Sequence, residues 1–137
     1  RKLLILARTV EVKAELADVD IQNLIPEAYQ SDVPYGQFKQ CFSDLDAHYA
    51  AVKSKLKEGE VLRYVGDLSI SASGKAELKV KLATVAKDSP LGGIQGSDSL
   101  FEIYTEGYGD QPMVIQGAGA GAEVTARGVF SDVLRLG

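Results

Sequence analysis

Two runs of alternating apolar and polar residues, separated by a short turn, constrain the fold of this chain most strongly. The first run spans residues 62–70 and the second spans residues 76–82, with Ser73-Gly74 between them. Side chains two residues apart on a strand point to the same face of a sheet. Each run therefore has one apolar and one polar face, which predicts an antiparallel hairpin with one face in water.

The region before the hairpin favours helices. Residues 2–8 are almost all apolar and predict a helix that is buried on more than one side, although a strand also fits so short a run. Residues 21–25 predict a short extended piece that Pro26 ends. Cys41 is the only cysteine, and its position beside Phe42 predicts a small core residue.

From Ser31 onward the apolar residues recur at steps of three and four, which predicts one or two helices. Ser31, Asp32 and Pro34 are typical of a helix start, and Gly59 is typical of a helix end. A possible capping box at Ser43 leaves a break at that point open. The apolar residues of this pattern are Tyr35, Phe38, Phe42, Leu45, Tyr49, Val52 and Leu56.

After the hairpin the pattern predicts a loop over 90–96, strands around 100–105 and 113–116, a glycine loop and a final helix. The apolar stripe expected on that helix consists of Ala126, Val129, Phe130 and Val133. The order of elements predicts an α+β fold in a single domain, residues 1–137. Its sheet is expected to be mixed, largely antiparallel, of about four strands, with helices packed on one face.

Composition and charge exclude several function classes. The net charge of −4 argues against a nucleic-acid partner, and no apolar run reaches the ~20 residues of a membrane span. A single cysteine fits a reducing compartment, so we expect a cytoplasmic protein. His48, the one histidine, lies off the apolar stripe and is expected to face solvent. No cluster has metal-ligand spacing, and no catalytic triad is available, so we expect no metal site.

The strongest local signal for ligand binding is Gly117-Ala118-Gly119-Ala120-Gly121 between a predicted strand and a predicted helix. Glycines at such a turn let backbone approach a ligand, and the helix start offers free N–H groups to an anion. The spacing is GxGxG rather than GxGxxG, and only 16 residues follow Gly121, too few for a complete dinucleotide-binding unit. A glycine loop needed only for tight packing explains the pattern equally well.

Four stretches together resemble homoserine dehydrogenase: residues 1–8, 61–66, 90–98 and 114–129. In that family a Rossmann domain holds NAD or NADP, and a second domain with a mixed sheet binds the substrate and forms the homodimer. The enzyme interconverts L-homoserine and L-aspartate 4-semialdehyde in threonine, methionine and isoleucine biosynthesis, either alone or fused to aspartate kinase. The resemblance implies that this chain is the second domain, with the cofactor held mainly by the domain it lacks.

Two site residues follow from the resemblance. Lys2 occupies the place of the family's catalytic lysine, which follows an arginine in an Asp-x-x-Arg-Lys pattern. An ammonium there can hydrogen-bond the carbonyl oxygen and act as general acid toward the alkoxide. Gly121 matches the position that contacts the nicotinamide cofactor, and Gly117 and Gly119 are expected to support the loop. The family's substrate-binding carboxylates lie upstream of Lys2.

The sequence begins inside an apolar stretch and ends directly after an amphipathic one, which is typical of a segment taken from a longer protein. We therefore expect a piece of a longer enzyme that is inactive alone. Two alternatives stay open from the residues themselves: a non-catalytic amino-acid-binding regulatory module, and a purely structural dimerisation domain.

Overall fold

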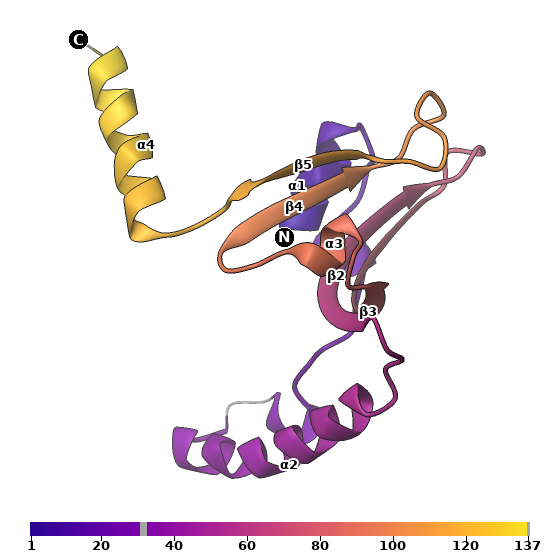
Figure 1. The fold of residues 1–137 in the computed structure, drawn as a ribbon, viewed down its shortest axis with the longest axis vertical. Helices are drawn as coiled ribbons and strands as arrows, with labels where there is room; N and C mark the ends of the chain where they lie inside the picture. The colour runs from indigo at the N-terminus through magenta and orange to yellow at the C-terminus, as the bar shows by residue number, and fades with distance from the viewer. Residues whose placement is uncertain (31–32, 137) are drawn as a thin grey trace. The chain divides into compact units, whose positions relative to one another are not determined.

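The computed structural model describes residues 1–30 and 33–136, and these divide into an N-terminal unit, Arg1–Val85, and a C-terminal unit, Ala86–Gly137 (Figure 1). In chain order, the elements that begin in the N-terminal unit are α1 (Lys2–Thr9), η1 (Leu16–Asp18), β1 (Val19–Ile21), η2 (Glu27–Tyr29), α2 (Tyr35–Lys53), β2 (Glu60–Ile70) and β3 (Ala76–Ala86). Those of the C-terminal unit are α3 (Pro90–Gly93), β4 (Asp98–Ile103), β5 (Met113–Ala118) and α4 (Ala122–Arg135).

The predicted hairpin is present as β2 and β3, which are neighbours in a three-stranded sheet of order β1-β3-β2. The turn between them closes with the Ser71 amide donating to the Lys75 carbonyl at 2.9 Å, and Gly74 has a φ of 80°. So short a connection joins antiparallel strands. The short strand β1 adds to the other edge of β3 in parallel, with Val19 opposite Leu78. The sheet is therefore mixed, as expected.

The helix α1 packs on this sheet and builds the core of the N-terminal unit. Its buried residues Leu3, Leu4 and Ala7 cluster with Val19 of β1 and Leu78 of β3. The prediction of a helix was correct, but burial on more than one side was wrong. Ile5 is 65% exposed and Leu6 is 40% exposed in this chain, because only one face of α1 contacts the sheet.

The helix α1 ends in a backbone motif in which glycine is the usual residue, but here a glutamate takes that position. Glu11 adopts a left-handed φ of 63°, a conformation that costs a side-chain-bearing residue about 1–2 kcal/mol. The Val12 amide donates to the Ala7 carbonyl at 2.9 Å, and the Glu11 amide donates to the Arg8 carbonyl at 3.1 Å. These two bonds form a Schellman motif, in which Val12 packs back on the core beside Ala7.

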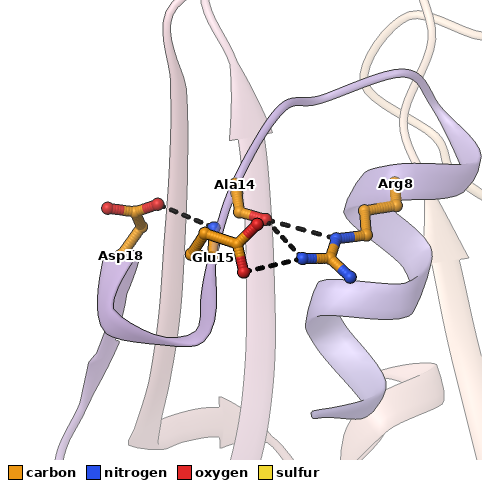
Figure 2. A network of polar contacts seen from close by, with 4 residues as sticks. All are labelled: Arg8, Ala14, Glu15 and Asp18. Carbon is orange, nitrogen blue, oxygen red and sulfur yellow. Dashed lines mark hydrogen bonds and ion pairs between the residues drawn. The ribbon is translucent and has the colours of Figure 1, made fainter.

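A polar network then fixes the path from α1 to β1 (Figure 2). The Arg8 guanidinium donates to the Ala14 carbonyl from Nε at 3.2 Å and from Nη2 at 3.0 Å, and Nη2 also contacts the Glu15 carboxylate at 3.0 Å. The Glu15 amide donates to the Asp18 carboxylate at 2.7 Å. The Arg8 side chain is half exposed, so its ion pair adds little to the free energy of folding. The main effect of the network is to orient the segment between α1 and β1.

Two element boundaries in the N-terminal unit differ from prediction. Of the extended piece expected over 21–25, only Ile21 belongs to a strand, as the last residue of β1. Beyond it, the Asn23 side chain accepts a hydrogen bond from the Ile25 amide at 3.1 Å, a local turn that competes with strand pairing. The chain therefore leaves the sheet well before Pro26.

The predicted helical stretch is one helix, α2, which begins at Tyr35 after Pro34 and runs past Ser43 without a break. The Ser43 hydroxyl donates to the Gln40 carbonyl at 3.4 Å instead of capping a new helix. The helix ends at Lys53, so the end predicted at Gly59 was wrong; Gly59, with a φ of 81°, turns the chain into β2. Ser31 and Asp32, the other predicted start residues, lie outside the described residues.

The C-terminal unit carries a sheet of its own, so the single sheet of about four strands was wrong. The strands β4 and β5 pair antiparallel over their whole length, from Asp98 opposite Ala118 to Ile103 opposite Met113. This two-stranded sheet is separate from β1-β3-β2. Period-two patterns predict each strand but carry no information on which strands pair. The α+β class is confirmed, with two sheets in place of one.

The loop predicted over 90–96 contains a helical turn, α3. The Ser89 side chain caps it by accepting from the Gly92 amide at 3.1 Å, and Pro90 occupies the first helical position. A Cβ at Gly92 would collide with the Ala86 carbonyl, so this glycine is required by close packing. The turn is therefore capped and compact.

Candidate functional site

Lys2 stands in the first turn of α1, with its side chain exposed. The residue before it, Arg1, is also cationic, and the first turn of α1 contains no acidic residue. Lys2 thus lies exposed beside Leu3 and Leu4 of the same helix, which are both buried.

The residue after Lys2 holds the start of α1 against the sheet. Leu3 is 8% exposed and lies over Gly66 of β2. A Cβ built on Gly66 would lie 3.4 Å from Leu3 Cδ1 and 3.7 Å from Leu3 Cβ. An isolated glycine inside a strand pattern is a sign of such close approach, and that signal could have singled out Gly66 from the sequence.

The glycine loop follows β5, as predicted, but it is shorter than the sequence suggests. The strand continues through Gly117 to Ala118, so only residues 119–121 connect β5 to α4. A Cβ on Gly119 would collide with the Ser99 side chain, and the Gly119 amide donates to the Ser97 carbonyl at 3.1 Å. Gly119 is therefore a packing residue, whereas a Cβ on Gly117 would meet nothing within 4 Å.

Gly121 is the residue directly before α4, and its backbone has a φ of 128° and a ψ of 149°. This combination is essentially restricted to glycine. A Cβ there would meet nothing within 4 Å in this chain, and the residue is exposed. Gly121 therefore presents bare backbone at the positive end of α4, with space around it. A conformational requirement alone is enough to explain why glycine occupies this position.

Lys2 and Gly121 belong to different units, so neither unit holds both predicted site residues. Within the described residues no group of three or more His, Cys, Asp or Glu side chains could hold a metal ion. Cys41 is fully buried in α2, as its prediction as a small core residue requires. No helix in the described part of the chain is both long and apolar enough to cross a membrane.

A cavity of about 600 Å³ lies within the N-terminal unit, between the segment after β1, α2 and the β2–β3 hairpin. Tyr49 closes one side by donating to the Leu24 carbonyl at 2.7 Å, and Gln22 closes another by accepting from the Leu82 amide at 2.9 Å. His48 lies at its edge and is exposed, which confirms the prediction for this residue. Neither Lys2 nor Gly121 lines this cavity.

Comparison with known proteins decides the family. A family model described as homoserine dehydrogenase matches residues 1–134, nearly the whole chain. The chain belongs to the homoserine dehydrogenase family. The resemblance drawn from the four sequence stretches is therefore confirmed.

Several relatives of known name match over almost the whole chain. The chloroplastic bifunctional aspartokinase/homoserine dehydrogenase 2 of Zea mays is 40% identical over 99% of this chain, which spans 15% of that relative. The homoserine dehydrogenase of Emericella nidulans is 39% identical over 99% of this chain, which spans 38% of it. The chain thus corresponds to less than two fifths of either relative.

The fold of this chain is also similar to part of a solved structure. A crystal structure of a Candida auris protein described as of unknown function superposes with a TM-score of 0.79 at 35% sequence identity. The match covers 98% of this chain and 37% of that protein.

Proposed function

We propose that this chain supplies the general acid of an enzyme that interconverts L-homoserine and L-aspartate 4-semialdehyde, and that Lys2 is this acid. The observation that carries the proposal is an exposed lysine at the start of a core-anchored helix, in a chain of the homoserine dehydrogenase family. The anchoring matters because general acid catalysis requires a proton donor within hydrogen-bond reach of the reacting oxygen.

In the direction of reduction, the Lys2 ammonium donates a hydrogen bond to the aldehyde oxygen of the semialdehyde, where negative charge develops. It then gives its proton to the alkoxide oxygen to form the hydroxyl of homoserine. In the reverse direction the neutral amine takes that proton back. The nicotinamide cofactor, NAD or NADP, supplies or accepts the hydride when bound.

Gly121 fits a role at the edge of that cofactor. Its exposed backbone, with open space where a Cβ would stand, allows close approach of a flat or anionic group. The free N–H groups of the first turn of α4 add a favourable field for phosphate. The rest of the cofactor site is assigned to parts of the parent enzyme outside this chain, so the 137 residues alone are expected to be inactive.

The proposal also covers partners and location. The substrate is a small amino acid or its semialdehyde, and the parent enzyme is a homodimer formed through the sheet. Exposed apolar pairs on one face of β4–β5, Phe101 opposite Ile115 and Ile103 opposite Met113, support an interface there. The cytoplasmic location stays a prediction, and the maize relatives are named chloroplastic.

The decisive experiment compares Lys2→Ala with Lys13→Ala in the full-length parent enzyme. Loss of the general acid is expected to lower kcat by about 10²–10⁴-fold with a small change in KM. Lys13 is an exposed lysine beyond the end of α1, and its replacement should leave kcat within twofold. Near wild-type turnover of the Lys2→Ala enzyme would refute the role of Lys2. It would favour a non-catalytic role for this chain within that enzyme, as an amino-acid-binding or dimerisation module.

A further inference from the structure

The contact between Gly66 and Leu3 is the closest approach of α1 to β2 that involves a glycine. All three heavy atoms nearest to a Cβ built on Gly66 belong to Leu3, at 3.4, 3.7 and 3.8 Å. The helix and the strand are in direct contact. A Cβ at residue 66 would therefore just fit against Leu3, and only a side chain larger than a methyl group would crowd the first turn of α1.

Leu3 cannot move away from β2 without loss of core packing. It is 8% exposed and shares a cluster with Leu4, Ala7, Val19 and Leu78. Because protein cores are close-packed, a side chain inserted beneath Leu3 must displace the backbone that carries it. That backbone continues directly into Lys2.

The far end of α1 is held independently. Ala7 is fully buried, and the Arg8 guanidinium binds the Ala14 carbonyl and the Glu15 carboxylate (Figure 2). The Schellman bond from the Val12 amide to the Ala7 carbonyl adds a further restraint. A push beneath Leu3 would therefore tilt the helix about its C-terminal end, and the displacement would be largest at Lys2.

We propose that Gly66 is a positioning residue for Lys2: because a side chain larger than a methyl group would crowd Leu3, the small size of residue 66 sets the height of the Lys2 ammonium above the sheet. The proposal rests on the proposed role of Lys2. It predicts a dependence on size. An alanine Cβ makes ordinary van der Waals contact with Leu3. The two methyl groups of valine extend beyond the Cβ, so we expect them to crowd Leu3.

The test uses the full-length parent enzyme with Gly66→Ala and Gly66→Val, and with Ser69→Val as the matched control. Ser69 is an exposed residue of β2, three positions from Gly66 and hence on the opposite face of the strand. We expect kcat within threefold for Gly66→Ala and Ser69→Val. For Gly66→Val we expect a loss of kcat of about 10–100-fold with KM changed less than threefold, as for a displacement near 1 Å.

A double-mutant cycle separates positioning from a general structural role. In a Lys2→Ala background, Gly66→Val should lower kcat no further, because the group it displaces is gone. Leu3→Ala combined with Gly66→Val should restore part of the lost kcat by making room beneath α1. Unchanged kcat in Gly66→Val, or an equal loss in the Lys2→Ala background, would overturn the proposal.

The outcomes also distinguish this inference from the proposed function. If the Lys2→Ala enzyme retains turnover, the proposed role of Lys2 is wrong. If the Lys2→Ala enzyme is inactive but the Gly66→Val enzyme is fully active, only the proposed role of Gly66 is wrong. If Gly66→Val does not fold, Gly66→Ser carries the same test, because its side chain is longer than the alanine Cβ that just fits. Wild-type kcat in Gly66→Ser then overturns the positioning role.

Discussion

The elements of the two units were predicted from equally clear sequence patterns, yet the two units differ in what they bury. The N-terminal unit has a cluster of buried apolar side chains from α1, β1 and β3, and Ala7 and Cys41 are fully buried. Among the described residues of the C-terminal unit, only Gly92 is buried. Its apolar stripe on α4 is open to solvent, with Val129 at 61% and Phe130 at 63% exposure.

The difference teaches that amphipathicity predicts an element but not its partner. The α1 helix lies over strands of its own unit, and its apolar face is covered by them. The α4 helix and the β4–β5 sheet also have apolar faces, but nothing in their own unit covers these faces. Stability within this chain therefore concentrates in the N-terminal unit, because burial of apolar surface is the dominant favourable term in folding.

The largest expected effect is the contrast between Leu78→Ala and Phe130→Ala in the 137-residue chain. Leu78 is 4% exposed at the centre of the core cluster, so its truncation should lower the free energy of unfolding by about 3 kcal/mol. Phe130→Ala should change it by less than about 0.5 kcal/mol. Urea unfolding followed by circular dichroism measures both. A comparable loss from Phe130→Ala would break the comparison, since it would mean that α4 is packed in solution.

A smaller gain is expected from Glu11→Gly, which relieves the left-handed residue in the Schellman motif after α1. Glycine adopts a φ of 63° without a Cβ penalty, so the free energy of unfolding should rise by about 0.5–1 kcal/mol. Glu11→Ala removes the same carboxylate but keeps the Cβ, and it should bring no such gain. The same unfolding assay compares the two variants. Equal stabilisation by both would assign the effect to the charge and not to the backbone.

The smallest expected effect on stability comes from one exposed hydrogen-bonded pair of titratable side chains in each unit. In the N-terminal unit the hydrogen bond and charge of Lys79, 2.7 Å away, lower the pKa of the Glu77 carboxyl below its ordinary value of 4.5. In the C-terminal unit the hydrogen bond to Glu102 raises the pKa of Tyr104 above its ordinary value of 10.0. These shifts have opposite consequences for the pH dependence of stability.

A lowered carboxyl pKa favours folding above the unfolded pKa and loses that contribution as pH falls through the folded value, so the Glu77 pair weakens below about pH 4.5. A raised tyrosine pKa favours folding below pH 10 and loses that contribution as pH rises through the folded value. Lys79→Met should raise the pKa of Glu77, measured by NMR titration. Lys75→Met, which removes a weaker charge effect, should raise it less. An unmoved pKa of Glu77 in Lys79→Met contradicts the pairing.

Several features of the site were predictable from local residues. The pattern Gly117–Gly121 between a strand and a helix located the loop, and the four matching stretches identified the family that the whole-chain comparison confirms. The assignments of Lys2 and Gly121 stay predictions, since they rest on the resemblance to the family. The role proposed for Gly66 needed the structure, because a strand pattern cannot say that Leu3, 63 positions earlier, lies over it.

The sequence by itself determined the local elements: the β2–β3 hairpin, the helical nature of α2 and α4, and the α+β class. These depend on periodicity, capping and turn residues, all of which are written in neighbouring positions. Only the tertiary structure decided that β4 and β5 form a sheet of their own, that α2 passes Ser43 unbroken, and that Glu11 ends α1 without a glycine. Strand pairing and helix packing join residues distant in sequence, and long-range burial can outweigh a local preference of about 1 kcal/mol.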